Sequence, residues 1–277
     1  MVIKLEDKKK SLIRLGDKKK SLIRLGPSKI GMVKDIENTF KDYYDEGLRA
    51  AEIPFTYGIF IKKKEDMEKV RKASEKFNIK LSIHAPYWIN LNSKEEIKIR
   101  QSKDRILRCC EIGDKIGAYR VVFHPGYYIG MEKEQTFQNI KKAILEMQEE
   151  IKKNKWNVKL APEVMGKINV FGSVKEIARL VCETKCKFCL DFAHIEAREG
   201  KIDFDNVKKL FGEEKFWHCH FSGIEYGEKG EKKHIKTKKE KWKELFKNLP
   251  ANKEITIINE APDTIGDSLE GLDVLNN

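Results

Sequence analysis

Eight short apolar segments, separated by longer amphipathic stretches, set the strongest limit on how this chain can fold. Alternating strand-like and helix-like segments are typical of a parallel sheet, because each helix returns the chain to start the next strand in the same direction. Between the fourth and fifth segments, apolar residues recur at steps of three and four from Phe137 to Ile151, as on one helix face. The predicted strands are Leu22–Leu25, Ala50–Ile53, Lys80–His84, Tyr119–His124, Lys159–Glu163, Lys187–Asp191, Phe216–Phe221 and Glu254–Glu260.

Eight such units can close into a (β/α)₈ TIM barrel or spread into an open, doubly wound sheet. The chain has 277 residues, and one barrel typically takes about 250. No G-x-G-x-x-G or G-x-x-x-x-G-K-[ST] loop follows a predicted strand, which argues against a nucleotide-binding open sheet. No linker rich in Pro, Gly or Ser divides the sequence. We therefore expect an α/β protein with a single TIM-barrel domain.

The N-terminus contains an exact duplication, in which residues 7–16 repeat as residues 17–26. Ten residues are too few for a unit that stacks into a solenoid, and one copy is enough to supply the first strand. We expect residues 1–16 to be a basic extension outside the fold and residues 17–277 to form the catalytic barrel.

Helix starts and one long connection are also predicted. Ser93, Ser173 and Thr237 are each followed three residues later by Glu, the pattern of a capping box. The stretch from Gly223 to Lys239, rich in Gly, Lys and Glu, is long enough for an active-site flap.

Six consecutive strands end on a side chain that can bind a metal ion. The carboxyl ends of TIM-barrel strands form one mouth, and active sites lie there. If these six side chains point inward, neighbours such as Ile83 and Phe123 must face the helices, and both are apolar as required. The six residues are His84, His124, Glu163, Asp191, His220 and Glu260.

Three imidazoles and three carboxylates in one basin lose hydration at a high cost unless cations lie between them. Mixed nitrogen and oxygen ligands suit Zn²⁺ or Mn²⁺ better than Ca²⁺. Glu163 has two oxygens and could bridge two ions, as in two-metal sites about 3.5–4 Å apart. His194, three residues after Asp191, and His234, in the flap, are weaker candidates, and His218 is expected in the core one layer deeper.

Charge and cysteine content indicate the kind of partner that the protein binds and the compartment in which it works. The net charge of +12, from 56 basic and 44 acidic residues, favours an anionic partner, although lysines spread over solvated helix faces would give the same balance. The six cysteines are expected to be reduced and mostly buried, because Cys186-x-x-Cys189 has no second pair at matching distance. No apolar run approaches 18 residues and no signal-peptide pattern begins the chain. We expect a cytoplasmic monomer with no membrane association.

The segment from His84 to Leu91, His-Ala-Pro-Tyr-Trp-Ile-Asn-Leu, resembles the His-x-x-Tyr-x-Ile-Asn-Leu motif of the endonuclease IV family. These apurinic/apyrimidinic (AP) endonucleases are trinuclear zinc enzymes of the xylose-isomerase-like TIM barrel superfamily. The resemblance runs from about Leu22 to Gly271, nearly the whole chain. Further matches follow in the family's order: Phe123-His-Pro-Gly126, Glu163 followed by Gly166, Asp191-Phe-Ala-His194, His220 and Glu260.

The resemblance implies a set of two to three Zn²⁺ ions, with Mn²⁺ as an alternative. It implies that Glu163 is the catalytic carboxylate that bridges the first two ions. The implied ligands are His84, His124 and Glu163 for the first ion, Glu163, Asp191, His220 and Glu260 for the second, and His194 and His234 for the third.

The resemblance also implies a substrate, double-stranded DNA that is cut 5′ to an abasic site during base excision repair. Tyr87 matches a family residue that enters the minor groove beside the lesion, although an aromatic residue there could equally pack against the rim. Lys62, Lys63 and Lys64 are candidate phosphate contacts, for which binding would weaken with salt.

The sequence departs from the family at two positions. The third zinc of the family also takes an Asp two residues before the last His, and Lys232 stands there in this chain. Glu231 could substitute if the loop shifts. The first strand ends in Gly26-Pro27-Ser28, where many members carry a His.

Two other functions remain open. A sugar isomerase or epimerase of the same superfamily would need only Glu163, Asp191, His220 and Glu260 to hold one divalent ion. A DNA-binding scaffold on a degenerate barrel is the third alternative, and the complete set of six strand-end ligands argues against it.

Overall fold

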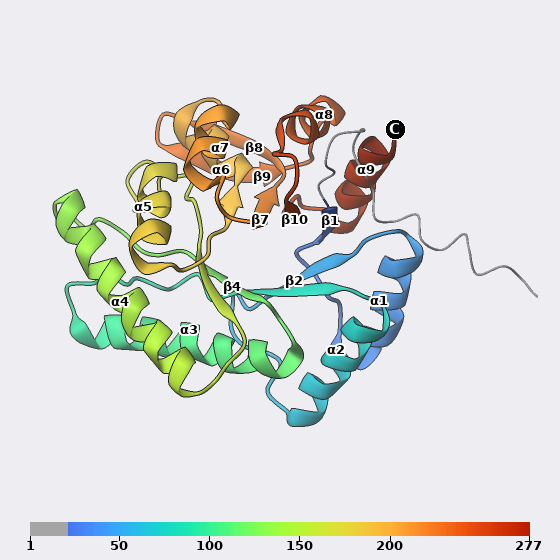
Figure 1. Cartoon of the computed structure of the whole chain (residues 1–277), viewed down its shortest axis with the longest axis horizontal. Coiled ribbons are helices and arrows are strands. Elements are labelled where there is room, and N and C mark those ends of the chain that lie inside the picture. Colours follow the sequence, from blue (N-terminus) through green and yellow to red (C-terminus); the bar gives the residue numbers. More distant parts are fainter. Residues whose placement is uncertain (1–21) are drawn as a thin grey trace, which may run out of the picture.

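The computed structural model describes residues 22–277 and contains a parallel eight-stranded barrel. The predicted extension, residues 1–16, and the first residues of the predicted barrel domain, 17–21, lie outside the described residues. Helices surround the strands in Figure 1. The barrel strands are β1 Leu22–Pro27, β2 Ala50–Pro54, β3 Lys80–His84, β4 Arg120–Phe123, β5 Lys159–Pro162, β6 Leu190–Asp191, β7 Phe216–Phe221 and β10 Glu254–Asn259.

The strands lie around the barrel in chain order. They pair in two four-stranded parallel sheets, β1-β10-β7-β6 and β2-β3-β4-β5. The seam between β1 and β2 is joined by the Arg49 amide, which donates to the Leu25 carbonyl at 3.0 Å. The second seam is joined by the Val164 amide, which donates to the Cys189 carbonyl at 3.0 Å. These bonds close the predicted TIM barrel.

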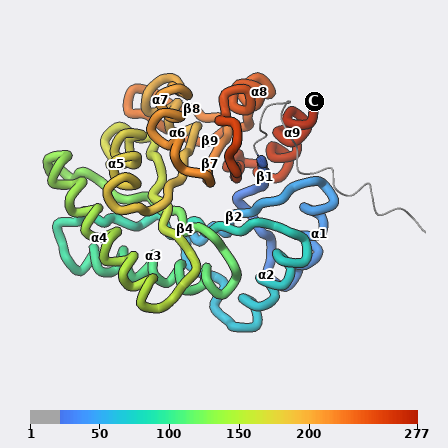
Figure 2. Tube along the Cα trace, viewed as in Figure 1, coloured from blue at the N-terminus to red at the C-terminus, as the bar shows by residue number. Residues whose placement is uncertain are grey.

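Helices cover the outside of the barrel, as the trace in Figure 2 shows. The apolar helix face predicted from Phe137 to Ile151 lies in α4 and is confirmed. Its five residues are all buried: Phe137, Ile140, Ile144, Met147 and Ile151. The helices are α1 Ile36–Asp45, α2 Lys64–Lys76, α3 Glu96–Ile116, α4 Lys133–Lys153, α5 Val174–Thr184, α6 Phe192–Glu199, α7 Phe204–Phe211, α8 Lys239–Asn248 and α9 Thr264–Asn276.

The inward and outward alternation of the strands agrees with the prediction. Ile83 and Phe123 are fully buried. Ile83 faces α3, since a Cβ built on Gly113 would lie 3.5 Å from its Cδ1. The opposite face of the strands therefore carries the polar residues that reach the mouth.

One of the three predicted capping boxes forms. Ser173 and Glu176 make the reciprocal bonds of a capping box at the start of α5. The other two predictions are wrong. Helix α3 starts after Glu95, which makes no side-chain cap bond. Thr237 donates its hydroxyl to Asp267 and accepts from the Gly223 amide, so it ties a loop to α9 instead of capping α8.

The predicted flap is an antiparallel hairpin, formed by β8 Gly223–Gly227 and β9 Gly230–Ile235. A bridge between Lys167 and Gly230 connects it to the loop after β5. The six cysteines are free and all but Cys182 are buried, as predicted. Within residues 22–277, no helix is long and apolar enough to cross a membrane.

Candidate metal centre

The strand-end side chains converge at one mouth of the barrel, around Glu163. This carboxylate is fully buried. Its Oε2 lies 3.1 Å from His84 Nε2 and 3.3 Å from His124 Nε2. Its Oε1 lies 3.2 Å from His194 Nδ1 and 3.3 Å from His220 Nδ1. One carboxylate therefore contacts four imidazoles, three from the ends of β3, β4 and β7 and one, His194, from the first turn of α6.

Two further carboxylates complete the cluster. Asp191 Oδ2 lies 3.3 Å from His194 Nδ1. Glu260 lies between two imidazoles, 3.5 Å from His220 Nδ1 and 3.8 Å from His234 Nε2. The ligand atoms fall into three groups within 4.8 Å: His84, His124 and Glu163; Glu163, Asp191, His220 and Glu260; and Asp191, His194 and His234. The structure thus brings together all eight residues that the sequence analysis named as metal ligands.

Two histidines are oriented by backbone carbonyls. His84 Nδ1 lies 2.8 Å from the Ala85 carbonyl, and His194 Nδ1 lies 3.0 Å from the Val164 carbonyl. A carbonyl can only accept, so Nδ1 carries the proton in the neutral ring and Nε2 keeps its lone pair. Histidines that bind metals are typically held in this way through their second nitrogen.

His220 and His234 are oriented by side chains. Ser222 donates its hydroxyl to the Gly223 carbonyl, so the 2.6 Å contact with His234 Nδ1 is a bond donated by the imidazole. His220 Nε2 lies 2.9 Å from Glu52 Oε1. In both rings the remaining nitrogen faces the carboxylates of the cluster.

Besides His220 Nε2, two buried polar atoms of the cluster lack a hydrogen bond among the described residues, Asp191 Oδ2 and His194 Nε2, although each lies 3.3 Å from a neighbouring ionisable group. Leaving such atoms unpaired costs about 1–3 kcal/mol each. A divalent cation would satisfy both, and the mixed imidazole and carboxylate set suits Zn²⁺ or Mn²⁺. The residues present therefore fit the predicted metal ions.

The electrostatics of the metal-free cluster agree with this fit. Burial opposes ionisation of Glu163, but His220 and His124 hold the pKa of its carboxyl well below the usual range. Burial would lower the pKa of His84, yet the bond to Glu163 raises it to about 9. Protons thus balance the carboxylates when no cation does, and metal binding releases them.

A β-bulge in the hairpin falls at Lys232, the position at which the sequence departs from the endonuclease IV pattern. Glu225 pairs with Lys233 and Tyr226 pairs with Glu231, so Lys232 is the extra residue. The bulge turns Lys232 and Lys233 toward Glu225, at 3.8 and 3.2 Å. Glu231 faces the mouth instead, with its Oε2 3.3 Å from His194 Nε2.

Glycine at position 166 makes room for this arrangement. A Cβ built there would lie 2.7 Å from Glu231 Cβ and 2.9 Å from His194 Cδ2. Real Cβ atoms do not approach other atoms so closely. Any larger residue at 166 would therefore push Glu231 or His194 out of place.

A hollow of about 300 Å³ opens over the cluster. It is lined by cluster residues together with Tyr87, Tyr127 and Lys167. Tyr87 is 43% exposed and its ring centroid lies 5.4 Å from that of His124, so it stands at the rim of the hollow. Lys62 and Lys64 line a separate hollow between α2 and α3, and Lys63 precedes α2.

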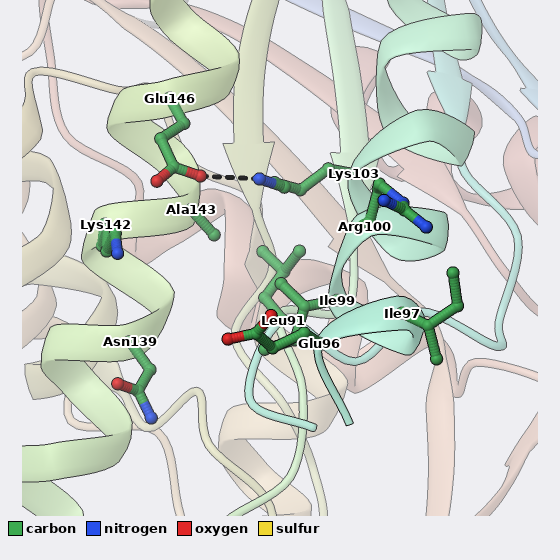
Figure 3. A pocket seen from close by; sticks show the side chains of 10 residues that line it. All are labelled: Leu91, Glu96, Ile97, Ile99, Arg100, Lys103, Asn139, Lys142, Ala143 and Glu146. Atoms are coloured by element: carbon green, nitrogen blue, oxygen red, sulfur yellow. Dashed lines mark hydrogen bonds and ion pairs between the residues drawn. The ribbon is translucent and has the colours of Figure 1, made fainter. Parts of the chain in front are cut away.

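A larger hollow of about 630 Å³ lies between α3 and α4, on the outside of the barrel. Figure 3 shows Lys103 and Glu146 facing each other across it, and their ion pair measures 2.6 Å. Its lining residues include no histidine or cysteine. This hollow therefore offers no imidazole or thiol to a metal ion.

Three residues of the site were not singled out as ligands or anchors from sequence: Glu52, Ser222 and Lys167. Glu52 gave the clearest signal, a carboxylate inside the apolar run Ala50–Ile53. His218, predicted to be core, is buried as expected but is bonded to Glu52 at 3.1 Å.

A family model described as xylose isomerase-like TIM barrel matches residues 40–277. An uncharacterized protein of Methanocaldococcus jannaschii is 37% identical over 199 residues, which cover 68% of this chain and 71% of that protein. A probable endonuclease 4 of Mycobacterium leprae is 32% identical over 149 residues, 52% of this chain and 58% of that protein.

Solved structures share the fold at low identity. SacUVDE superposes with a TM-score of 0.69 and 18% identity, covering 88% of this chain and 85% of its own. Endonuclease IV from Thermus thermophilus has a TM-score of 0.65 and 20% identity, covering 92% and 97%. A D-tagatose 3-epimerase-like protein has a TM-score of 0.63 and 18% identity, covering 88% and 93%.

Proposed function

This chain belongs to the xylose isomerase-like TIM barrel family, and we propose that it is a metal-dependent phosphodiesterase that cuts DNA 5′ to abasic sites. The observation that carries the proposal is the position of His84 and His124 beside Glu163, at 3.1 and 3.3 Å. These two histidines lie outside the four-residue group that a one-ion isomerase requires, and together with Glu163 they would hold a further ion. Probable endonuclease 4 of Mycobacterium leprae gives independent support.

Bound divalent cations would neutralise a phosphodiester, lower the pKa of a water molecule and stabilise the leaving oxygen. Glu163 belongs to two neighbouring groups and turns one oxygen to His84 and His124 and the other to His220, so its carboxylate would be a ligand shared by the first two ions. Because it is buried and held ionised, Glu163 needs no rearrangement before it binds.

The residues around the mouth provide for the substrate. Tyr87 and Tyr127 offer partly exposed rings beside the hollow, and Lys167 offers a positive charge for a phosphate. A sugar without a base can enter such a hollow with little unstacking, which favours abasic sites over intact nucleotides. The positive net charge of +12 favours association with DNA.

We place a third ion position between His194, His234 and Glu231. Glu231 takes the role of the carboxylate that the family supplies two residues before the last histidine. Burial raises its pKa, but His194 and His234 lower it to about 2, so this carboxylate is ionised and available as a ligand. The full complement is then two to three Zn²⁺ ions, with Mn²⁺ as the alternative.

The test is incubation of the zinc-loaded protein with an end-labelled duplex that carries one tetrahydrofuran abasic mimic. We expect a single nick on the 5′ side of the mimic and none in the matched undamaged duplex. Glu163→Gln keeps the size of the side chain but loses the charge that bridges the ions, and should reduce the rate by at least about 100-fold. A wild-type rate in Glu163→Gln would refute the assigned role.

A sugar isomerase or epimerase is the second candidate. It is favoured by the complete group of Glu163, Asp191, His220 and Glu260 and by the epimerase fold neighbour. Conversion of ketohexoses by the same preparation, without nicking of the abasic duplex, would replace the nuclease assignment with this one.

A further inference from the structure

A buried polar network lies in the barrel interior, beneath the metal centre. Glu52 of β2 and His218 of β7 are completely buried. Glu52 Oε2 accepts from Ser82 at 2.7 Å and faces His218 Nε2 at 3.1 Å. Tyr119 lies at the far end, with its hydroxyl 2.6 Å from His218 Nδ1. None of these side chains belongs to the three groups around Glu163, and the network reaches them only through His220.

The proton positions in this network follow from its acceptors. The carboxylate of Glu52 can only accept, so His218 carries its proton on Nε2, and Tyr119 donates to Nδ1 of the same ring. Ser82 and His218 both donate to Oε2. The other oxygen, Oε1, is therefore left for a different partner.

That partner is His220. Its Nε2 lies at the ion-pair distance of 2.9 Å from Glu52 Oε1, and among the described residues neither atom is engaged in a hydrogen bond with any other group. Glu52 Oε1 is nearer to the ring than the carboxylates that face Nδ1, so the single proton of the neutral ring is assigned to Nε2. The lone pair of the neutral ring then lies on Nδ1, which faces Glu163 at 3.3 Å and Glu260 at 3.5 Å.

His220 differs from the other oriented histidines in the charge of its anchor. Carbonyl or hydroxyl oxygens hold His84, His194 and His234. A full negative charge behind an imidazole makes the ring a stronger electron donor toward a cation. Burying a carboxylate is also costly, so a neutral acceptor would hold the ring at a lower cost if orientation were all that was needed.

We propose that Glu52, supported by Ser82, His218 and Tyr119, is a positioning residue that fixes His220 with Nδ1 as its metal-binding atom. The inference rests on the proposed metal centre but not on the DNA substrate. Glu52 touches neither the mouth hollow nor the other ligands that line it, so its effect passes through His220.

The test compares Glu52→Gln with Glu254→Gln in the full chain. Glu52→Gln keeps the shape but removes the charge that sets the imidazole proton. Glu254 makes a partly exposed ion pair with Arg24, far from the cluster residues in the fold, at the amino-terminal end of β10. Glu254→Gln is therefore the matched control, because it makes the same change of side chain away from the metal centre. Competition with a chromophoric chelator measures Zn²⁺ affinity. Nitrogen-detected NMR of the metal-free proteins, recorded at alkaline pH where the imidazoles of the cluster are neutral, reports the His220 tautomer.

We expect Glu52→Gln to weaken Zn²⁺ binding by about 10- to 100-fold and to shift the His220 proton partly to Nδ1. Glu254→Gln should match the wild type in both measurements, and circular dichroism should report an intact fold in both variants. Wild-type affinity together with an unchanged tautomer in Glu52→Gln would overturn the proposal. Failure of the nuclease proposal looks different, because Zn²⁺ binding would still depend on Glu52 while no DNA was nicked.

Discussion

Single residues decide whether this barrel mouth can hold ions. Glu163 contacts four imidazoles, yet glycine at position 166 is needed as well, because it leaves the space in which Glu231 and His194 approach each other. Gly26 has a comparable role at the barrel seam, where a Cβ would lie 1.7 Å from the Ala50 carbonyl oxygen. Absence of a side chain is thus a structural requirement at both positions.

The role of Gly166 can be tested with Gly166→Ala. The added methyl group should cost about 1–3 kcal/mol of folding stability through overpacking and should reduce the metal content, because it displaces Glu231 or His194. Gly227→Ala, in the hairpin that carries Glu231, is the control, since the atom nearest to the added methyl group would belong to the flexible side chain of Lys232. Elemental analysis and urea unfolding measure the two effects, and equal metal content in both variants would contradict the prediction.

At the scale of elements, the strands were largely predictable and the hairpin was not. Strands β3 and β7 have the predicted bounds, because their apolar runs are bordered by charged or turn-forming residues. The regular strand β6 is shorter than predicted and begins only at Leu190, although the amides of Lys187 and Cys189 already bond to carbonyls of β5. Strand ends, and with them the ligands, follow from local sequence.

The contacts that sequence could not predict join distant parts of the chain. The position of Glu52 inside an apolar run indicated an inward carboxylate, but its partner His220 is brought near only by closure of the barrel. The register of the hairpin depends on the bulge at Lys232. In this register Glu225 forms ion pairs with two neighbouring lysines, Lys232 and Lys233. Thr237 does not cap α8 for the same kind of reason, because Asp267 and the Gly223 amide occupy its hydroxyl. Ser93 instead accepts a local bond from the Glu95 amide, before α3 begins.

The bulge makes a prediction about paired variants. Lys232→Asp restores the residue type of the family, yet it should add no metal binding, because position 232 faces Glu225 and solvent. Glu231→Gln should lower the affinity at the third ion position. Titration of the metal-free proteins with Zn²⁺ measures both. If Lys232→Asp gains an ion while Glu231→Gln behaves as the wild type, the register described for β9 is wrong.

At the scale of the whole molecule, the cluster connects the two sheets of the barrel. His84, His124 and Glu163 lie at or just after the carboxyl ends of β3, β4 and β5 of one sheet, whereas Asp191, His220 and Glu260 lie at or just after those of β6, β7 and β10 of the other. Ions bound among them would link both sheets across the seams. Metal binding should therefore stabilise the complete barrel and not only the mouth.

Removal of the ions should lower the melting temperature. A ligand held at 1,000 times its dissociation constant stabilises the folded state by about 4 kcal/mol, and each kcal/mol corresponds to about 2–4 °C in a chain of this size. We expect a decrease of roughly 10 °C on chelation, measured by calorimetry, and recovery on addition of Zn²⁺. Equal melting temperatures with and without chelator would show that the cluster binds no ion tightly.

The different anchors of the histidines have a consequence for inherited variation. Ala85 and Val164 hold their histidines through backbone carbonyls, which no substitution can remove. Ser222 and Glu52 act through side chains, which a single mutation can delete. In a descendant of this protein, a single mutation can therefore weaken the orientation of His234 or His220 while every metal ligand is kept. No single substitution removes the carbonyl oxygens that orient His84 and His194.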